Sequence, residues 1–154
     1  MKMIVTKPEK CIACHLCEGA CSFSHEQTFQ PSLTRIWVHD FVEEAYYFPV
    51  TCFHCADAPC KQVCPTFAIV REPSGQVKVI DDKCIGCKMC LLACPFGVMG
   101  FHEQKGVAQN CDLCGGDPQC VKVCTVDALE FIDTDTVPWK KQFDFAKAAA
   151  AARA

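Results

Sequence analysis

Residues 84–95 read CIGCKMCLLACP, and this stretch decides the fold of the chain. The spacing C-x2-C-x2-C-x3-C followed by proline is the run with which bacterial ferredoxins hold iron–sulfur clusters. In such a run the first three thiolates hold one cluster, and the fourth serves a neighbouring cluster. The pattern therefore predicts one 4Fe–4S site in this stretch and a second one close to it.

Three further groups of four cysteines accompany this stretch, and the four quartets use all 16 cysteines of the 154-residue chain. The first quartet, CIACHLCEGAC at residues 11–21, has the same spacing. The second, CFHCADAPCKQVCP at residues 52–65, and the fourth, CDLCGGDPQCVKVC at residues 111–124, have a longer gap after the second cysteine. Four complete quartets predict four 4Fe–4S clusters and a chain that transfers single electrons.

Two other uses of so many cysteines are less consistent with the sequence. A disulfide-rich secreted protein needs an export signal, and the opening segment MKMIVTKPEKC has no apolar signal region. Structural zinc sites usually pair two short C-x2-C knuckles or include histidine. No apolar run is long enough to span a membrane, so the cytoplasm is the expected compartment.

The charge of the loaded protein argues against nucleic-acid binding. The chain has a formal net charge of −3. Each oxidised 4Fe–4S core carries 2+ and binds four thiolates, so four sites add −8 and the loaded protein reaches about −11. Such a protein favours partners with a basic docking surface.

The segments between the quartets predict an α+β fold with short hairpins. Strands are expected at residues 68–70 and 77–80 around a turn at residues 73–75. The insert at residues 22–51 suggests another hairpin that turns at residues 40–45. The segment TVDALEFID after Cys124 repeats the pattern of PTFAIVRE after Cys64.

These signals divide the chain into a tandem ferredoxin-like domain at residues 1–135 and a helical tail at residues 136–154. Module A would hold the quartets at 52–64 and 84–94. Module B would hold the quartets at 11–21 and 111–124. The fold expected is two bacterial-ferredoxin-like modules related by a pseudo-twofold axis, with the hairpin insert and a C-terminal helix.

The crossing of the fourth cysteine to a neighbouring cluster predicts how the quartets share their clusters. Quartets two and three are separated by one hairpin and should pair, which leaves quartets one and four to pair with each other. Pairing one with two and three with four stays open as the alternative. The expected ligand sets are Cys11, Cys14, Cys17 and Cys124 (cluster 1); Cys111, Cys114, Cys120 and Cys21 (cluster 2); Cys52, Cys55, Cys60 and Cys94 (cluster 3); and Cys84, Cys87, Cys90 and Cys64 (cluster 4).

Residues 8–133 resemble the four-cluster electron-transfer subunits of molybdenum and tungsten oxidoreductases, of the dimethyl sulfoxide reductase beta-subunit type. The motifs NCDLC at residues 110–114 and CPFGVM at residues 94–99 carry the resemblance. It implies the one-with-four and two-with-three pairing, four clusters in a line, and an electron-transfer subunit without a catalytic site of its own.

The segment CIACHLCEGACSFSHEQTFQPSLTRIWV, residues 11–38, is similar to the small iron–sulfur subunits of the tungsten aldehyde oxidoreductase family. That likeness implies a large tungsto- or molybdopterin catalytic subunit as partner, with a FAD/NAD-reducing subunit or a ferredoxin at the other end of the line of clusters. The alternatives are a free-standing polyferredoxin and a subunit of a benzoyl-coenzyme A reductase, formate dehydrogenase or hydrogenase. End-to-end self-association of a linear conductor is a further hypothesis.

Several other residues near the quartets carry expectations. His15 and His54 lie inside cluster loops but should not be ligands, because each quartet already has four cysteines. His25, His39 and His102 show no partner pattern. Seven apolar residues should form dry packing around the clusters: Ile12, Phe53, Phe67, Ile69, Ile85, Phe96 and Leu129.

Overall fold

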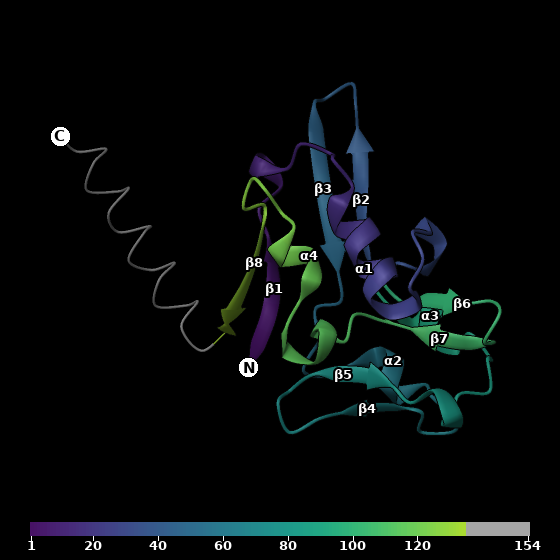
Figure 1. Ribbon diagram of the computed structural model, residues 1–154. Coiled ribbons are helices and arrows are strands. Elements are labelled where there is room, and N and C mark those ends of the chain that lie inside the picture. Colours follow the sequence, from purple (N-terminus) through teal and green to yellow (C-terminus); the bar gives the residue numbers. More distant parts are fainter. Residues whose placement is uncertain (135–154) are drawn as a thin grey trace.

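The computed structural model describes residues 1–134 (Figure 1), so the expected helical tail at residues 136–154 lies outside the described residues. Short helices and strands alternate along the described chain, as the α+β expectation requires. No helix within residues 1–134 has the length and apolar character needed to cross a membrane.

The strands form four separate antiparallel pairs. The pairs are β1 (Lys2–Thr6) with β8 (Leu129–Asp133), β2 (Ile36–Phe41) with β3 (Tyr46–Thr51), β4 (Ile69–Arg71) with β5 (Val77–Val79), and β6 (Gly100–His102) with β7 (Val107–Gln109). The α-helices are α1 (Leu16–Glu26), α2 (Pro59–Gln62), α3 (Met89–Ala93) and α4 (Gln119–Lys122). Short 3₁₀ turns cover Pro8–Lys10, Pro31–Leu33, Asp81–Lys83 and Leu113–Gly116.

The hairpin predicted between quartets two and three is confirmed as β4–β5. Gly75 takes a φ of 87° in its turn, a left-handed conformation that favours glycine. The amide of Glu72 donates to the carbonyl of Gln76 and closes the turn. Val77, the first residue of β5, is fully buried at 0% exposure, so the hairpin is anchored in the core.

The hairpin predicted in the insert is confirmed as β2–β3, and its two ends differ in burial. Ile36 and Thr51 pair at the base, and both are buried. Phe41 and Tyr46 pair at the tip and are exposed, as is Val42 in the turn. The base of the insert therefore belongs to the core, whereas its tip is surface.

The pairing of β1 with β8 joins the two ends of the described chain and was not predicted. The segment after quartet four forms a strand, as its likeness to the segment after quartet two suggests, but its partner is the segment before Cys11. The amide of Lys7 donates to the carbonyl of Ala128, just as the amide of Ile80 donates to that of Ala68. The β1–β8 pair thus repeats the geometry of β4–β5 without a connecting turn.

Cysteines supply much of the two buried cores. The first core packs around Ile4, Ile36, Leu113 and Leu129, and the second around Ile69, Val77 and Met99. Helix α1 contacts α4 beside the first core, and α2 contacts α3 beside the second. The buried cysteines of the first core are Cys17, Cys21, Cys111 and Cys120, and those of the second are Cys60 and Cys90.

We predict that Ile36→Ala lowers the thermal stability of the folded, cluster-loaded protein. Ile36 is 1% exposed, and truncation of a buried isoleucine costs about 2–5 kcal/mol. Val42→Ala is the matched control in the same hairpin, since Val42 is 74% exposed. Anaerobic thermal unfolding should give a lower midpoint for Ile36→Ala alone; equal midpoints for the two variants would show that the hairpin base contributes nothing to the core.

Candidate iron–sulfur centres

Twelve of the cysteines line three separate cavities, four to each. The cavities measure about 370, 330 and 330 Å³ and are walled almost entirely by sulfur and apolar groups. Their common lining of four cysteines and apolar residues suits three copies of one guest. The cysteine sets are Cys52, Cys55, Cys60 and Cys94; Cys64, Cys84, Cys87 and Cys90; and Cys11, Cys14, Cys17 and Cys124.

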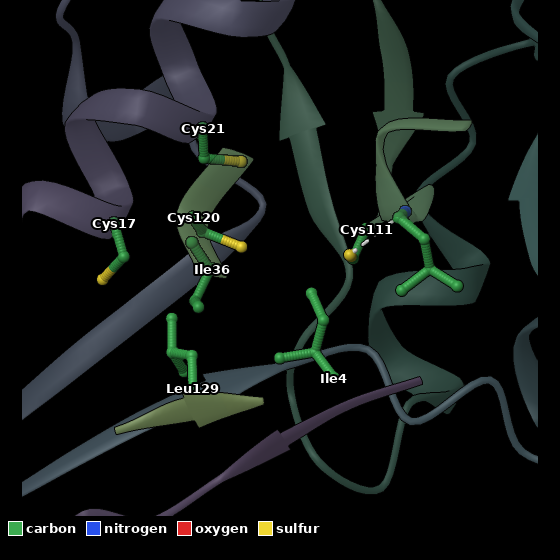
Figure 2. Packing of buried hydrophobic residues seen from close by; sticks show 8 residues of the cluster. Ile4, Cys17, Cys21, Ile36, Cys111, Cys120 and Leu129 are labelled. Atoms are coloured by element: carbon green, nitrogen blue, oxygen red, sulfur yellow. Dashed lines mark hydrogen bonds between the residues drawn. The ribbon is translucent and has the colours of Figure 1, made fainter. Parts of the chain in front are cut away.

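Of the remaining four cysteines, Cys21, Cys111 and Cys120 lie in the first core, and Cys114 lies in the quartet-four loop beside it. In Figure 2 the sulfurs of Cys21 on α1 and Cys120 on α4 point toward the side where Cys111 lies, whereas Cys17 directs its sulfur the other way. Burial raises the pKa of Cys120, and the charges of Cys111, Cys21 and Cys114 raise it further. These four thiols are therefore close electrostatic neighbours.

The four loops share one left-handed backbone position. The residue before the second cysteine of each quartet has a left-handed φ: 53° at Ala13, 48° at His54, 69° at Gly86 and 54° at Leu113. Such a turn directs successive amides inward, which creates a concave site for negative charge. At Gly86 a Cβ would also lie 2.6 Å from the carbonyl oxygen of Gly106, so glycine is required there.

Backbone amides donate hydrogen bonds to the cysteine sulfurs in a repeated pattern. The amides of His54 and Leu113 each lie 3.5 Å from the sulfur of the first cysteine of their quartets. The amides of Ala68 and Ala128 each lie 3.2 Å from the sulfur of the fourth. Donors aimed at sulfur stabilise thiolates and, through them, the added electron of a reduced cluster.

The buried thiols need a positive partner to ionise. Burial raises the pKa of Cys60 and Cys90 to about 11, and that of Cys17 and Cys111 to about 12. A metal centre reverses this preference, because its charge favours the thiolate. Zinc would hold four sulfurs about 2.3 Å from one ion, whereas a cubane of iron and sulfide requires four sulfurs arranged around a wider space.

The expected packing around the clusters is confirmed in large part. Ile69 and Leu129 are buried and line cysteine cavities. Ile12, Phe53, Ile85 and Phe96 are exposed at the surface but also line these cavities. Phe67 is 76% exposed and lines none of the three.

His54 is buried, and its ring is held against the backbone of β5. Its Nδ1 accepts a hydrogen bond of 3.1 Å from the amide of Val77 and lies 3.9 Å from the sulfur of Cys52. Burial lowers the pKa of His54, which favours the neutral ring. The side chain also lines the cavity that contains Cys52, Cys55, Cys60 and Cys94.

Asn110 connects two quartets. Its buried side-chain amide donates to the sulfur of Cys52 at 3.6 Å. The same amide donates to the backbone carbonyls of Val77 at 2.8 Å and of the adjacent residue Cys111 at 3.0 Å. One side chain thus links the first cysteine of quartet two with the first cysteine of quartet four. The NCDLC motif contains this residue, but the spacing of cysteines alone gives no sign of its role.

A charged cluster between α1 and the quartet-four loop was missed by the sequence analysis. Asp112 accepts from His25 Nε2 at 2.9 Å and from Arg35 Nη1 at 2.8 Å. Burial opposes ionisation of Asp112, yet the His25 bond and the nearby Arg35 charge lower its pKa to about 2. The same bond raises the pKa of His25 to about 10. The three residues are 10 to 87 positions apart, so no local pattern could reveal them.

His15 has a similar anchoring role. Its Nδ1 lies 2.9 Å from Glu18 and its Nε2 lies 3.1 Å from Asp40. Glu18 in turn accepts a 2.7 Å hydrogen bond from the amide of Val38. This network ties the loop of quartet one to the β2–β3 hairpin, which agrees with the expectation that His15 is not a ligand.

We predict that Asp112→Asn destabilises the protein by about 1–3 kcal/mol, since it weakens two charge-assisted hydrogen bonds in a partly buried cluster. Asp117→Asn is the control in the same loop, because Asp117 pairs with Lys122 on the exposed surface. Anaerobic thermal unfolding should separate the two variants. Equal stability of Asp112→Asn and the unmodified protein would rule out a structural role for the cluster.

Comparisons with known proteins agree with these sites. The family described as "4Fe-4S dicluster domain" matches residues 43–134, and a "4Fe-4S binding domain" matches residues 8–24. The two matches together contain all four quartets, so 4Fe–4S clusters are the cofactors of this chain, and its sixteen cysteines suffice for four.

Two relatives are similar over most of their length. The "Aliphatic sulfonate oxidoreductase, polyferredoxin-like subunit" of Pyrococcus furiosus is 41% identical over 144 residues, which cover 91% of this chain and 83% of that protein. The B subunit of the anaerobic dimethyl sulfoxide reductase of Escherichia coli is 36% identical over 163 aligned positions, which cover 94% of this chain and 79% of that subunit.

A subunit of the solved "Active site complex BamBC of Benzoyl Coenzyme A reductase", in complex with benzoyl-CoA, shares the fold. The TM-score is 0.52 at 23% identity, and the alignment covers 99% of this chain and 96% of that one. From the match over residues 43–134 and the two long relatives, the chain belongs to the 4Fe-4S dicluster domain family.

Proposed function

We propose that this chain is an electron-transfer subunit that carries four 4Fe–4S clusters in a line. The observation that supports it most directly is the grouping of cysteines from different quartets around three cavities of similar size. The proposed ligand sets are Cys11, Cys14, Cys17 and Cys124; Cys111, Cys114, Cys120 and Cys21; Cys52, Cys55, Cys60 and Cys94; and Cys84, Cys87, Cys90 and Cys64.

The clusters would be arranged in two ferredoxin-like modules within residues 1–135, related by a pseudo-twofold axis. Contacts of α1 with α4 and of α2 with α3 support this division. So does the repeated local geometry after Cys64 and Cys124, where Phe67 and Asp127 have φ values of 54° and 53°. Module A would be contiguous at residues 52–94, and module B would combine the two ends of the described chain.

The proposed order of the clusters follows from the junction at Asn110. Cys52 and Cys111 are close enough for the charge of one to raise the pKa of the other, and Asn110 contacts both residues. The two inner clusters would therefore be those of Cys52 and Cys111. The outer clusters would be those of Cys11 and Cys84.

The ends of this line are accessible. Cys14 in one outer set and Cys87 in the other are exposed, whereas Cys111 and Cys60 of the inner sets are buried. The residue after the first cysteine is apolar and exposed at both ends, 57% at Ile12 and 66% at Ile85. Each end could thus dock a redox partner while the inner clusters are shielded from water.

The clusters, when bound, supply one-electron chemistry at each site. The chain supplies ligands, amide donors to sulfur and shielding. Burial and the negative charge of each site disfavour reduction, and the amide donors partly offset this effect. No residue of the proposed mechanism acts on a substrate, so the chain would be a subunit without catalysis of its own.

The best-supported partner class is a large molybdo- or tungstopterin catalytic subunit, with an aldehyde oxidoreductase as the first candidate. The relatives named as subunits of a sulfonate oxidoreductase and of dimethyl sulfoxide reductase support a partner complex in general. A flavin subunit or a soluble carrier would take the electrons at the far end. We place this complex in the cytoplasm, where thiols remain reduced.

Purification of the tagged protein from its native host under anaerobic conditions tests the function. We expect sixteen irons per chain, together with tungsten or molybdenum in a large co-purifying subunit. Sixteen irons without any partner would favour a free polyferredoxin instead. Zinc in place of iron would contradict the proposal.

Double variants test the ligand sets. Cys11→Ala and Cys124→Ala would damage the same proposed cluster, so the double variant should lose no more than about four irons per chain. Cys111→Ala with Cys124→Ala would damage two clusters and should lose about twice as many. Iron analysis and electron paramagnetic resonance (EPR) spin counting measure the difference. Equal losses in the two double variants would contradict the crossed pairing.

A further inference from the structure

His54 combines a fixed ring with a donor that has no partner among residues 1–134. The side chain is 1% exposed and lies in the loop between the first two cysteines of quartet two. Its Nδ1 accepts the amide hydrogen of Val77 at 3.1 Å. This bond fixes the orientation of the ring against β5.

The same bond determines which ring nitrogen carries the proton. A nitrogen that accepts a hydrogen bond is unprotonated, and a neutral imidazole then carries its hydrogen on the other nitrogen. Nε2 of His54 is therefore an N–H donor. Within residues 1–134, this buried nitrogen has no hydrogen-bond acceptor. An unsatisfied buried donor is costly, so an acceptor is expected at this place.

The surroundings leave one kind of acceptor. His54 lines the cavity of Cys52, Cys55, Cys60 and Cys94, and the other side chains around that cavity are apolar. They include Phe53, Pro59, Val98 and Met99. Among side chains and the proposed guest, sulfur is therefore the acceptor that this cavity offers to the imidazole.

We propose that Nε2 of His54 donates a hydrogen bond to a sulfur of the cluster held by Cys52, Cys55, Cys60 and Cys94, and thereby raises the reduction potential of that cluster. This inference rests on the proposed ligand set. Reduction adds one negative charge to the cluster, and a donor at sulfur stabilises the more negative state. His54 is thus a positioning and tuning residue, not a ligand.

Quartet two differs from the other three quartets at this loop position. The equivalent loop positions, each just before the second cysteine, are occupied by Ala13, Gly86 and Leu113. None of these side chains has an N–H group. Because the Cys52 site also adjoins Cys111 through Asn110, the tuned cluster would be the one at the junction of the two modules.

The test combines a direct spectroscopic measurement with potentials. Protein labelled with ¹⁵N-histidine is reduced and studied by electron–nuclear double resonance, with His54→Gln and His54→Leu as variants. His102→Gln is the matched control, because His102 is also buried but pairs with Glu26 away from the cysteines. We expect a ¹⁵N coupling to one reduced cluster that disappears in both His54 variants and persists in His102→Gln.

EPR-monitored redox titration supplies the second readout. The reduction potential of one cluster should be about 59 mV lower in His54→Leu, which at a fixed applied potential is about a tenfold fall in its reduced-to-oxidised ratio for one electron. The ratio should fall less in His54→Gln, because glutamine retains an amide donor. Unchanged potentials in all variants, or the absence of a His54-dependent ¹⁵N coupling in the unmodified protein, would overturn the inference.

Iron analysis of the same samples separates this inference from the proposed function. A full iron content with no effect of His54 would reject only the hydrogen bond. An iron content below four clusters in the unmodified protein would reject the ligand sets themselves. If His54→Leu loses its cluster, the labelled unmodified protein and His54→Gln still decide the question.

Discussion

A thiolate buried in a protein needs a positive charge beside it, and this structure depends on that requirement. The cysteines at the centres of both cores have raised thiol pKa values because burial disfavours their charged forms. Iron supplies the compensating charge and joins segments from different parts of the chain. The cofactor is therefore part of the core, and folding and cluster binding are one process for this chain.

The backbone of each loop meets the cluster in the same way, while the side chains differ. A left-handed residue before the second cysteine recurs in all four quartets, and amides reach sulfur from several loops. This shared geometry explains how one short motif can be used four times. Differences among the clusters must then come from the side chains around each loop, such as the imidazole of His54 and the amide of Asn110.

Local patterns in the sequence predicted the local structure well. The turn residues around Gly75 and the alternation in the insert gave the two hairpins, because each depends on neighbouring residues. The β1–β8 pair escaped prediction since its partners stand at opposite ends of the described chain. The His25–Asp112–Arg35 cluster was missed for the same reason. Phe67 was expected to pack around a cluster because it is apolar, but its loop position leaves it 76% exposed.

The pairing of β1 with β8 has a consequence for biosynthesis. The ribosome releases the first quartet and β1 early, yet β8 and the fourth quartet emerge only after residues 111–133 have been made. With the proposed ligand sets, the contiguous segment at residues 52–94 would receive iron while translation continues. The first quartet would stay without its proposed partners until residues 111–124 have been made. The proposed pairing thus implies that the central two quartets assemble before the two that flank them in the sequence.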